Sequence, residues 1–105
     1  MVIGNLEWQD GTVENVTLAQ AQEYAASLGD GWRVPTLDEL LSIVDTSKYD
    51  PACSVFPDCP PVDTWTVTRW SGSPLFAYVV NFFDGNGGSA VSIDNILTVR
   101  AVRIV

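Results

Sequence analysis

Two tryptophans and an arginine lie close together in the second half of the chain, and side chains of these types are common in binding sites. Trp65, Arg69 and Trp70 follow a proline-rich segment. An indole ring offers a flat apolar face that stacks on a sugar or a peptide, and arginine adds charge and hydrogen-bond donors. This spacing predicts a ligand-binding site. The alternative is that Trp65 belongs to the core and Trp70 packs half-exposed at the surface.

Three oxygen-bearing side chains further along the chain could hold a calcium ion. Asp84 and Asn86 stand in an Asp-Gly-Asn-Gly-Gly run, and Asp94 follows later. Ca²⁺ prefers carboxylate and amide oxygens, so Asp84, Asn86 and Asp94 are a candidate Ca²⁺ site, and Asp84 and Asn86 are candidate ligand-binding residues. The run is also a strong turn signal, in which Asp and Asn accept hydrogen bonds from the backbone. A plain hairpin turn is therefore the alternative, and no other cofactor is predicted.

The two cysteines, Cys53 and Cys59, stand close together among prolines. This spacing predicts a short disulfide, which would place the protein in an oxidising compartment or on a virion surface. Two unpaired thiols are the alternative. The four Cys or His ligands of a structural zinc site are not present in the sequence.

Catalysis has little support in the sequence. Histidine, the commonest general base, does not occur in the chain. The sequence also has no nucleophile elbow and no glycine-rich phosphate loop. The adjacent carboxylates of Asp38 and Glu39 fit the start of a helix, where negative charge is favourable. We therefore expect a protein that is not an enzyme.

The length and charge of the chain exclude several further classes of function. The 105 residues fit a single domain, 1–105, with one modest core. Thirteen acidic and five basic residues give a net charge of −8, and no basic cluster is present to bind nucleic acid. No apolar run approaches the roughly 20 residues of a membrane span, so membrane insertion is not expected. No signal-peptide pattern opens the sequence.

Hydrophobic spacing and capping residues predict two helices in the first half of the chain. Thr17 and Gln20 form a capping box before an apolar stripe, which predicts a helix over 18–28. Thr36 and Glu39 form a second capping box, which predicts a helix over 36–45. The connector between them carries Trp32, Arg33 and Pro35. We expect structural roles for these residues, with Trp32 packed where the helices meet and Arg33 paired with a carboxylate or stacked on a ring.

The rest of the chain indicates strands and one long loop. Prolines predict a braced loop over 46–63. Later residues with β-prone side chains predict strands over 65–68, 76–83, 91–93 and 98–105, and a short strand or two is expected within 1–9. Arg100 and Arg103 in the last run are expected to be structural. Helices early and strands late indicate an α+β protein.

The order of these motifs resembles the Lcl C-terminal domain-like family. Residues 31–40, Gly-Trp-Arg-Val-Pro-Thr-Leu-Asp-Glu-Leu, are similar to the family hallmark Gly-Trp-Arg-Leu-Pro-Thr followed by Glu-Leu. Residues 64–68 look like its Trp-Ser-Ser-Thr element, and residues 99–103, Val-Arg-Ala-Val-Arg, match its terminal Val-Arg-x-Val-Arg. The likeness spans nearly the whole chain.

The resemblance implies a C-type-lectin-like fold, with two helices packed on a small, mainly antiparallel sheet with long loops. Members occur in secreted or surface proteins and in phages, often as terminal binding modules, which implies an extracellular, cell-surface or virion location. The chain departs from the pattern at Ala101, where many members carry a cysteine. The adhesin that names the family is associated with sulfated glycans, but a charge of −8 repels a polyanion, so this ligand is not carried over.

The sequence thus predicts a non-catalytic recognition module that binds a surface glycan or a protein ligand. Its late loops, within 60–95, would form the binding face on a rigid scaffold. The second hypothesis is a structural or assembly protein of a virion or surface appendage. In that case the same face would make a homo-oligomer.

Overall fold

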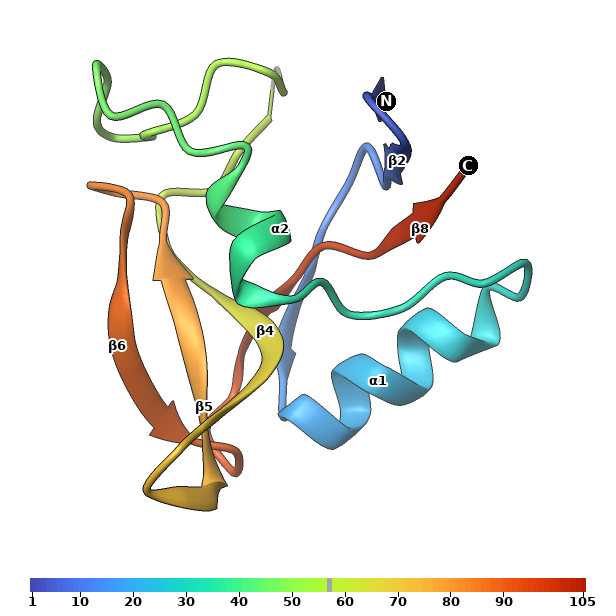
Figure 1. Ribbon diagram of the computed structural model, residues 1–105, viewed down its shortest axis with the longest axis vertical. Coiled ribbons are helices and arrows are strands. Elements are labelled where there is room, and N and C mark those ends of the chain that lie inside the picture. The colour runs from blue at the N-terminus through green and yellow to red at the C-terminus, as the bar shows by residue number, and fades with distance from the viewer. Residues whose placement is uncertain (57) are drawn as a thin grey trace.

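Both helices begin at the predicted capping boxes in the computed structural model, which describes residues 1–56 and 58–105 (Figure 1). Helix α1 spans Leu18–Ser27, close to its predicted range. The backbone N–H of Gln20 donates to the Thr17 hydroxyl at 3.2 Å, and the Thr17 N–H donates to the Gln20 side chain at 2.9 Å. These two bonds satisfy N–H groups that have no partner inside the helix.

Helix α2 spans Leu37–Leu41 and is shorter than the predicted 36–45. After its last residue the hydrogen bonds tighten, because Val44 donates to the Leu41 carbonyl three residues back. The next N–H, that of Asp45, leaves the helix altogether and donates to the Ala52 carbonyl at 2.8 Å. The long loop therefore stops the helix from continuing by accepting the Asp45 hydrogen bond.

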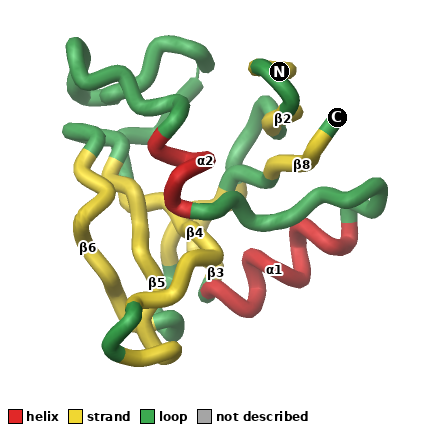
Figure 2. The backbone as a smooth tube through the Cα atoms, in the orientation of Figure 1, coloured by secondary structure: helices red, strands yellow, loops and turns green. Residues whose placement is uncertain are grey.

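Five strands form the larger sheet, in the order β3-β7-β4-β5-β6 (Figure 2). Its neighbouring strands are antiparallel except for β4 and β7, which pair in parallel at Thr64 and Thr98. The strands are β3 (Val13–Val16), β4 (Asp63–Trp70), β5 (Ser73–Asn81), β6 (Asn86–Ser92) and β7 (Leu97–Val99). Strand β3 was not predicted from the sequence. Between α2 and β4 the described residues form neither helix nor strand, as the prolines predict.

Three short strands form a second, antiparallel sheet in the order β1-β2-β8. They are β1 (Val2–Ile3), β2 (Leu6–Trp8) and β8 (Val102–Ile104). The predicted single strand over 98–105 is thus wrong, because the run is divided between β7 in one sheet and β8 in the other. The break falls at Arg100 and Ala101. There the Arg100 guanidinium donates hydrogen bonds to the backbone carbonyls of Gln9 and Asp10. The Ala101 carbonyl accepts a hydrogen bond from the Gln9 N–H at 2.9 Å.

Strand β5 separates two apolar clusters. One cluster packs α1 against the sheet, and its largest buried member is Trp65. The other cluster contains Leu40 of α2 together with Trp8. Ala77 and Val79 belong to the first cluster and Val80 and Phe82 to the second, because successive side chains of a strand point to opposite faces. The predicted α+β class is therefore confirmed.

Neither described helix is long and apolar enough to span a bilayer.

Candidate functional site

Two half-exposed aromatic rings meet at the turn between β4 and β5. The exposed fractions of Trp70 and Phe76 are 43% and 37%. Their ring centroids lie 5.9 Å apart at an interplanar angle of 81°, which is a favourable edge-to-face contact. Together with neighbouring residues they line a hollow of about 400 Å³. We call this surface the aromatic face; its residues are Trp70, Phe76, Tyr78, Gly88 and Ala90.

Strand pairing places these side chains on one side of the sheet. Phe76 and Tyr78 alternate with buried residues along β5, and Tyr78 stands opposite Ala90 of β6. The small residue at position 90 leaves room beside the ring. The aromatic face is therefore an ordered strand surface rather than a collection of mobile loop side chains.

Helix α2 covers the other end of the same side and leaves the aromatic face open. The Leu37 N–H donates to the Thr68 hydroxyl at 2.9 Å, which fixes the start of the helix on β4. Leu41 reaches β6, where a Cβ added at Gly87 would lie 2.7 Å from its Cδ2 atom. Since α2 has only five residues, its cover ends before Phe76.

The Trp70 ring lies directly on Gly72 of the turn. A Cβ added at Gly72 would overlap three atoms of the indole ring. The absence of a side chain at this position therefore sets the tilt of Trp70 on the aromatic face.

Trp65 and Arg69 do not share this surface. Trp65 has no exposed area, and its Nε1–H donates to the Val16 carbonyl at 2.8 Å. Its side chain lies in the core under α1, so the predicted ligand-binding role of Trp65 has no accessible surface to act through. Arg69 is exposed and forms no ion pair within the described residues, but it does not line the hollow beside Trp70.

The predicted calcium trio is divided between the two ends of β6. Asp84 and Asn86 lie at its start and Asp94 lies beyond its end, which at about 3.3 Å per residue is a separation of roughly 20 Å or more. One ion cannot contact all three. The Asp84 and Asn86 oxygens accept from the N–H groups of Asn86 and Gly88, both at 2.9 Å. This is the turn chemistry that the alternative interpretation described, and it corrects the predicted Ca²⁺ site.

The connector residues are tied to both neighbouring elements. Arg33 exchanges two backbone hydrogen bonds of 2.9 Å with Val102 of β8, and its guanidinium pairs with Glu39. The ring of Trp32 lies under the guanidinium of Arg103, with 5.0 Å from the Cζ atom to the ring centroid. Pro35 is buried and its carbonyl accepts from Val67 of β4 at 2.8 Å. The Gly-Trp-Arg-x-Pro-Thr segment thus joins β8, α2 and β4.

The family model of the Lcl C-terminal domain matches residues 3–103. The chain belongs to this family. No curated protein sequence matches it.

In this Lcl C-terminal domain the two cysteines are free, and the predicted disulfide is wrong. Cys53 and Cys59 are both buried and approach to 3.3 Å, well beyond the roughly 2 Å of an S–S bond. A hydrogen bond between the thiols, the largest influence on both, lowers the pKa of Cys53 to about 6 and raises that of Cys59. The Arg100 charge also favours the Cys53 thiolate. Two unpaired thiols, the alternative interpretation, describe this loop.

Arg100 connects the long loop of the domain to its N-terminal segment through hydrogen bonds. The side chain is 3% exposed, and its guanidinium donates to the carbonyls of Gln9, Asp10 and Asp58 at 2.8, 2.7 and 2.9 Å. It also stacks on Phe56, with its Cζ atom 3.8 Å from the ring centroid. Burial is the main influence on this group and lowers the pKa of Arg100. The hydrogen bonds compensate for removing this charge from water.

Sequence reasoning missed most of the aromatic face. The apolar run 76–83 predicts a central strand, and a central strand suggests two buried faces. The signal that could have found Phe76 and Tyr78 is their alternation with Ala77 and Val79, because the larger residues share one side. The length of α2 decides whether that side is covered, and this length depends on the loop hydrogen bond of Asp45 described above.

Proposed function

We propose that this domain is a non-catalytic recognition module of C-type-lectin-like fold, which binds a surface glycan or a protein ligand through its aromatic face. The observation that carries the proposal is the pair of half-exposed rings, Trp70 and Phe76, beside an open hollow. Aromatic side chains with an exposed apolar face stack on sugars and on peptide side chains. We further propose an extracellular, cell-surface or virion location, in keeping with family membership.

The surroundings of the aromatic face favour a ligand without strong negative charge. Arg69 is the nearest cation in sequence, while the chain as a whole carries a net charge of −8. The long-range field of the protein therefore opposes a sulfated or phosphorylated polymer. A neutral glycan or an uncharged peptide segment fits this electrostatic setting better. No nucleic-acid partner is proposed.

A second candidate is an assembly role that uses the same surface. Strand β6 is one of the two outer strands of the five-stranded sheet, and an outer strand presents unpaired N–H and C=O groups to another chain. Leu75, Phe76 and Trp70 add exposed apolar area beside it. In this alternative, two copies would pack their aromatic faces together, with their β6 edges close to each other. Light scattering at rising protein concentration distinguishes the two roles, because a strictly monomeric species argues against assembly.

The direct test is a screen of the purified domain against immobilised glycans and host-cell surfaces, with the Trp70→Ala variant beside it. Recognition through the aromatic face predicts that the variant loses binding while its melting temperature stays nearly unchanged. Trp32→Ala is the control, because Trp32 lies at the connector, away from the hollow. Normal binding by the Trp70 variant would contradict the assigned face, and no hit for the native domain would favour the assembly role.

A further inference from the structure

The aromatic face carries three ring side chains, and this composition restricts the class of ligand that it can bind. Trp70, Phe76 and Tyr78 line the hollow of about 400 Å³, together with the small residues Gly88 and Ala90. The face of an aromatic ring carries partial negative charge and attracts a cation. The hollow can therefore bind a positively charged group through its rings.

The two half-exposed rings form a corner that is already in place without a ligand. Trp70 and Phe76 stand at 81° to each other with 5.9 Å between their ring centroids, so a group that enters the angle between them contacts two rings. The Trp70 ring also lies on Gly72, where an added Cβ would overlap it. A site whose side chains are already ordered loses less entropy when the ligand binds.

The basic residue next to Trp70 in the sequence does not add positive charge to the hollow. Arg69 is paired in register with Ala77, and Ala77 belongs to the apolar cluster under α1. Side chains of directly paired residues share one face of a sheet, so Arg69 lies on the side opposite Phe76 and Tyr78. A cation in the hollow is therefore separated from Arg69 by the sheet.

Two carboxylates stand at the borders of the aromatic face instead. Asp38 lies in the first turn of α2, the turn that is hydrogen-bonded to β4. The Asp94 N–H donates to the Ser92 hydroxyl at 3.3 Å, and Ser92 stands opposite Phe76. Both carboxylates are exposed, and neither forms an ion pair within the described residues. With a net charge of −8 for the whole chain, the electrostatic potential over the hollow is complementary to a cation.

The hydrogen-bonding groups of the hollow distinguish between kinds of cation. Among the described residues that line it there is no carboxylate and no amide side chain; the polar groups are the Trp70 indole N–H, which can only donate, and the Tyr78 hydroxyl. A primary ammonium or a guanidinium group has several N–H donors, which would lose hydrogen bonds to water in such a site. A quaternary ammonium group has no N–H and loses none. The lining therefore favours a quaternary ammonium group over a basic side chain.

The open shape of the hollow favours a compact group over a long stem. Trp70 and Phe76 are 43% and 37% exposed, so the rings border a shallow surface rather than a deep channel. A trimethylammonium group on a two-carbon stem, as in choline, fits such an opening. The longer stem of a trimethylated lysine would remain largely in water.

We propose that the aromatic face binds a quaternary ammonium group of the choline type, displayed by the surface ligand of the domain. This inference rests on the recognition role proposed above and names the chemical group that is recognised. The rings of Trp70, Phe76 and Tyr78 contact the methyl groups and stabilise the positive charge. Asp38 and Asp94 add a longer-range attraction.

The test is an NMR titration of the ¹⁵N-labelled domain with choline chloride and, in parallel, with its neutral isostere dimethylbutanol, in which a carbon atom replaces the nitrogen. The proposal predicts shifts at the amides of Phe76, Tyr78 and Gly88, and binding of the isostere weaker by about threefold or more. Ethanolamine, which has the same stem and a primary ammonium group, should also bind more weakly than choline. Equal affinity for choline and either analogue, or no shift with choline, would overturn the proposal.

Ring variants test whether the cation is bound by the aromatic face itself. Trp70→Ala should abolish the choline shifts, and Phe76→Leu, which keeps an apolar side chain without the ring, should weaken binding by about threefold or more. Trp32→Ala is the control, because its ring lies under Arg103 and outside the hollow. Equal weakening by Trp70→Ala and Trp32→Ala would place the cation elsewhere.

A pair of charge variants tests the attraction by carboxylates at the border. Asp94→Asn should weaken choline binding by about twofold, and the effect should disappear at high salt. Glu23→Gln removes the same charge from an exposed position on α1 and should leave binding unchanged. Equal effects of the two substitutions would contradict a local role for Asp94.

Two further outcomes separate this inference from the recognition role on which it rests. A glycan that binds through Trp70, combined with no shift from choline, would leave the recognition role intact and overturn the quaternary ammonium class. A peptide with trimethylated lysine that binds more tightly than choline would assign the hollow to a protein ligand and overturn the choline type. Choline binding that is lost in Trp70→Ala supports both the role and the ligand class.

Discussion

The carboxylate of Glu39 closes the capping box of α2 and at the same time pairs with Arg33. Its Oε1 and Oε2 atoms accept from the two Nη groups of Arg33 at 2.6 and 2.7 Å, and Oε1 also accepts from the Thr36 N–H at 2.9 Å. One side chain therefore starts the helix and fixes the connector that precedes it. This geometry explains why the Trp-Arg-x-Pro-Thr segment is followed by a glutamate three residues after the threonine.

Glu39→Gln should destabilise the domain by about 1 kcal/mol at pH 7, because glutamine keeps the cap but loses the ion pair. The hydrogen bond from Arg33 lowers the pKa of Glu39 below its usual 4.5, while partial burial opposes the shift. A lowered folded pKa means that the stabilisation is complete above about 4.5 and is lost as pH falls through the folded value. The difference in unfolding midpoint between native and variant proteins should therefore shrink between pH 6 and pH 3. A constant difference would contradict this role of the pair.

Trp65→Ala and Trp70→Ala should have very different effects on stability. Removing the fully buried ring of Trp65 leaves a cavity and an unpaired Val16 carbonyl, at a cost of about 3–5 kcal/mol. Removing the half-exposed ring of Trp70 should cost less than about 1 kcal/mol. Urea unfolding measures both values, and acrylamide should quench the fluorescence of Trp70 but not that of Trp65. Similar losses in the two variants would contradict the assigned burial.

Gly72→Ala should move the Trp70 ring without altering any residue of the aromatic face. The added methyl group would overlap the ring, and Trp70 is exposed enough to swing away. The expected result is a changed Trp70 emission spectrum and weaker binding of any ligand found in the screen. Gly11→Ala, where a Cβ meets no atom within 4 Å, is the matched control. Unchanged spectra in both variants would show that the glycine does not set the tilt of the ring.

Arg100→Met should be among the most destabilising single substitutions in the chain, at about 3 kcal/mol or more. Methionine retains apolar contact with Phe56 but leaves the carbonyls of Gln9, Asp10 and Asp58 without their donor. Arg69→Met removes the same charge from an exposed side chain and should change stability by less than about 0.5 kcal/mol. Equal unfolding midpoints for the two variants would contradict the anchoring role of Arg100.

The absorbance of thiolate at 240 nm should rise in one step with a midpoint near pH 6. This step reports Cys53, whose pKa is lowered to about 6 chiefly by the hydrogen bond from Cys59. Cys59→Ala removes that donor and should move the midpoint upward. Cys53→Ala should remove the step near pH 6 and bring the pKa of Cys59 back toward the ordinary thiol range, because the hydrogen bond with Cys53 is the main cause that raises it. A midpoint near the ordinary thiol value in the native protein would contradict the close contact of the two thiols.

Short sequence motifs predicted the structural features that depend only on residues close together in the chain. Both capping boxes mark helix starts correctly because the partners stand three residues apart in sequence. The end of α2 depends instead on Ala52, whose carbonyl takes the hydrogen bond of Asp45. Likewise, the break of the terminal run at Arg100 follows from carbonyls some ninety positions away. No window of local sequence contains such partners.

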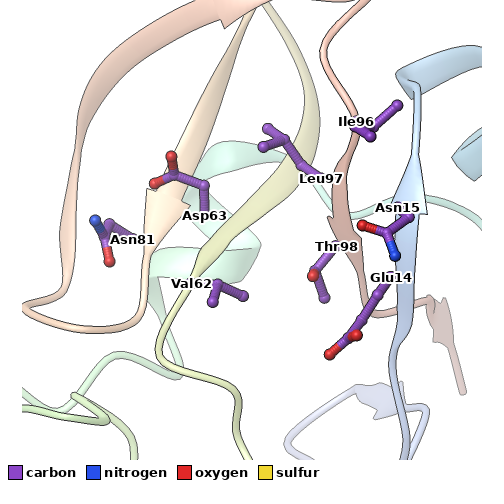
Figure 3. Close-up of a pocket in the computed structure, with 8 residues that line it drawn as sticks. All are labelled: Glu14, Asn15, Val62, Asp63, Asn81, Ile96, Leu97 and Thr98. Carbon is purple, nitrogen blue, oxygen red and sulfur yellow. The ribbon is translucent and has the colours of Figure 1, made fainter.

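For the candidate sites too, the sequence showed the residue types but not their exposure or their positions in the sheet. Trp70 was predicted from its residue type and is accessible, whereas Trp65 has the same type and is buried, so exposure decided between them. Asp94 was grouped with Asp84 by closeness in sequence, although β6 lies between them and keeps them apart. A hollow lined by Glu14, Asp63 and Thr98 lies where β3, β7 and β4 come together (Figure 3), and the order of strands that gathers these residues is encoded by no motif.

The pairing of β2 with β8 has a mechanical consequence. The Met1 amino group donates to the Trp8 carbonyl at 3.0 Å, and the Val105 N–H donates to the Asn5 carbonyl at 3.0 Å, so Met1 and Val105 lie at opposite ends of β2. A pulling force applied through Met1 and Val105 would therefore act along the strands and shear the hydrogen bonds of the small sheet together, instead of opening them one at a time. Such a load reaches the five-stranded sheet only after the small sheet has opened. The Trp70–Phe76 contact would thus stay intact while the domain is held under modest tension.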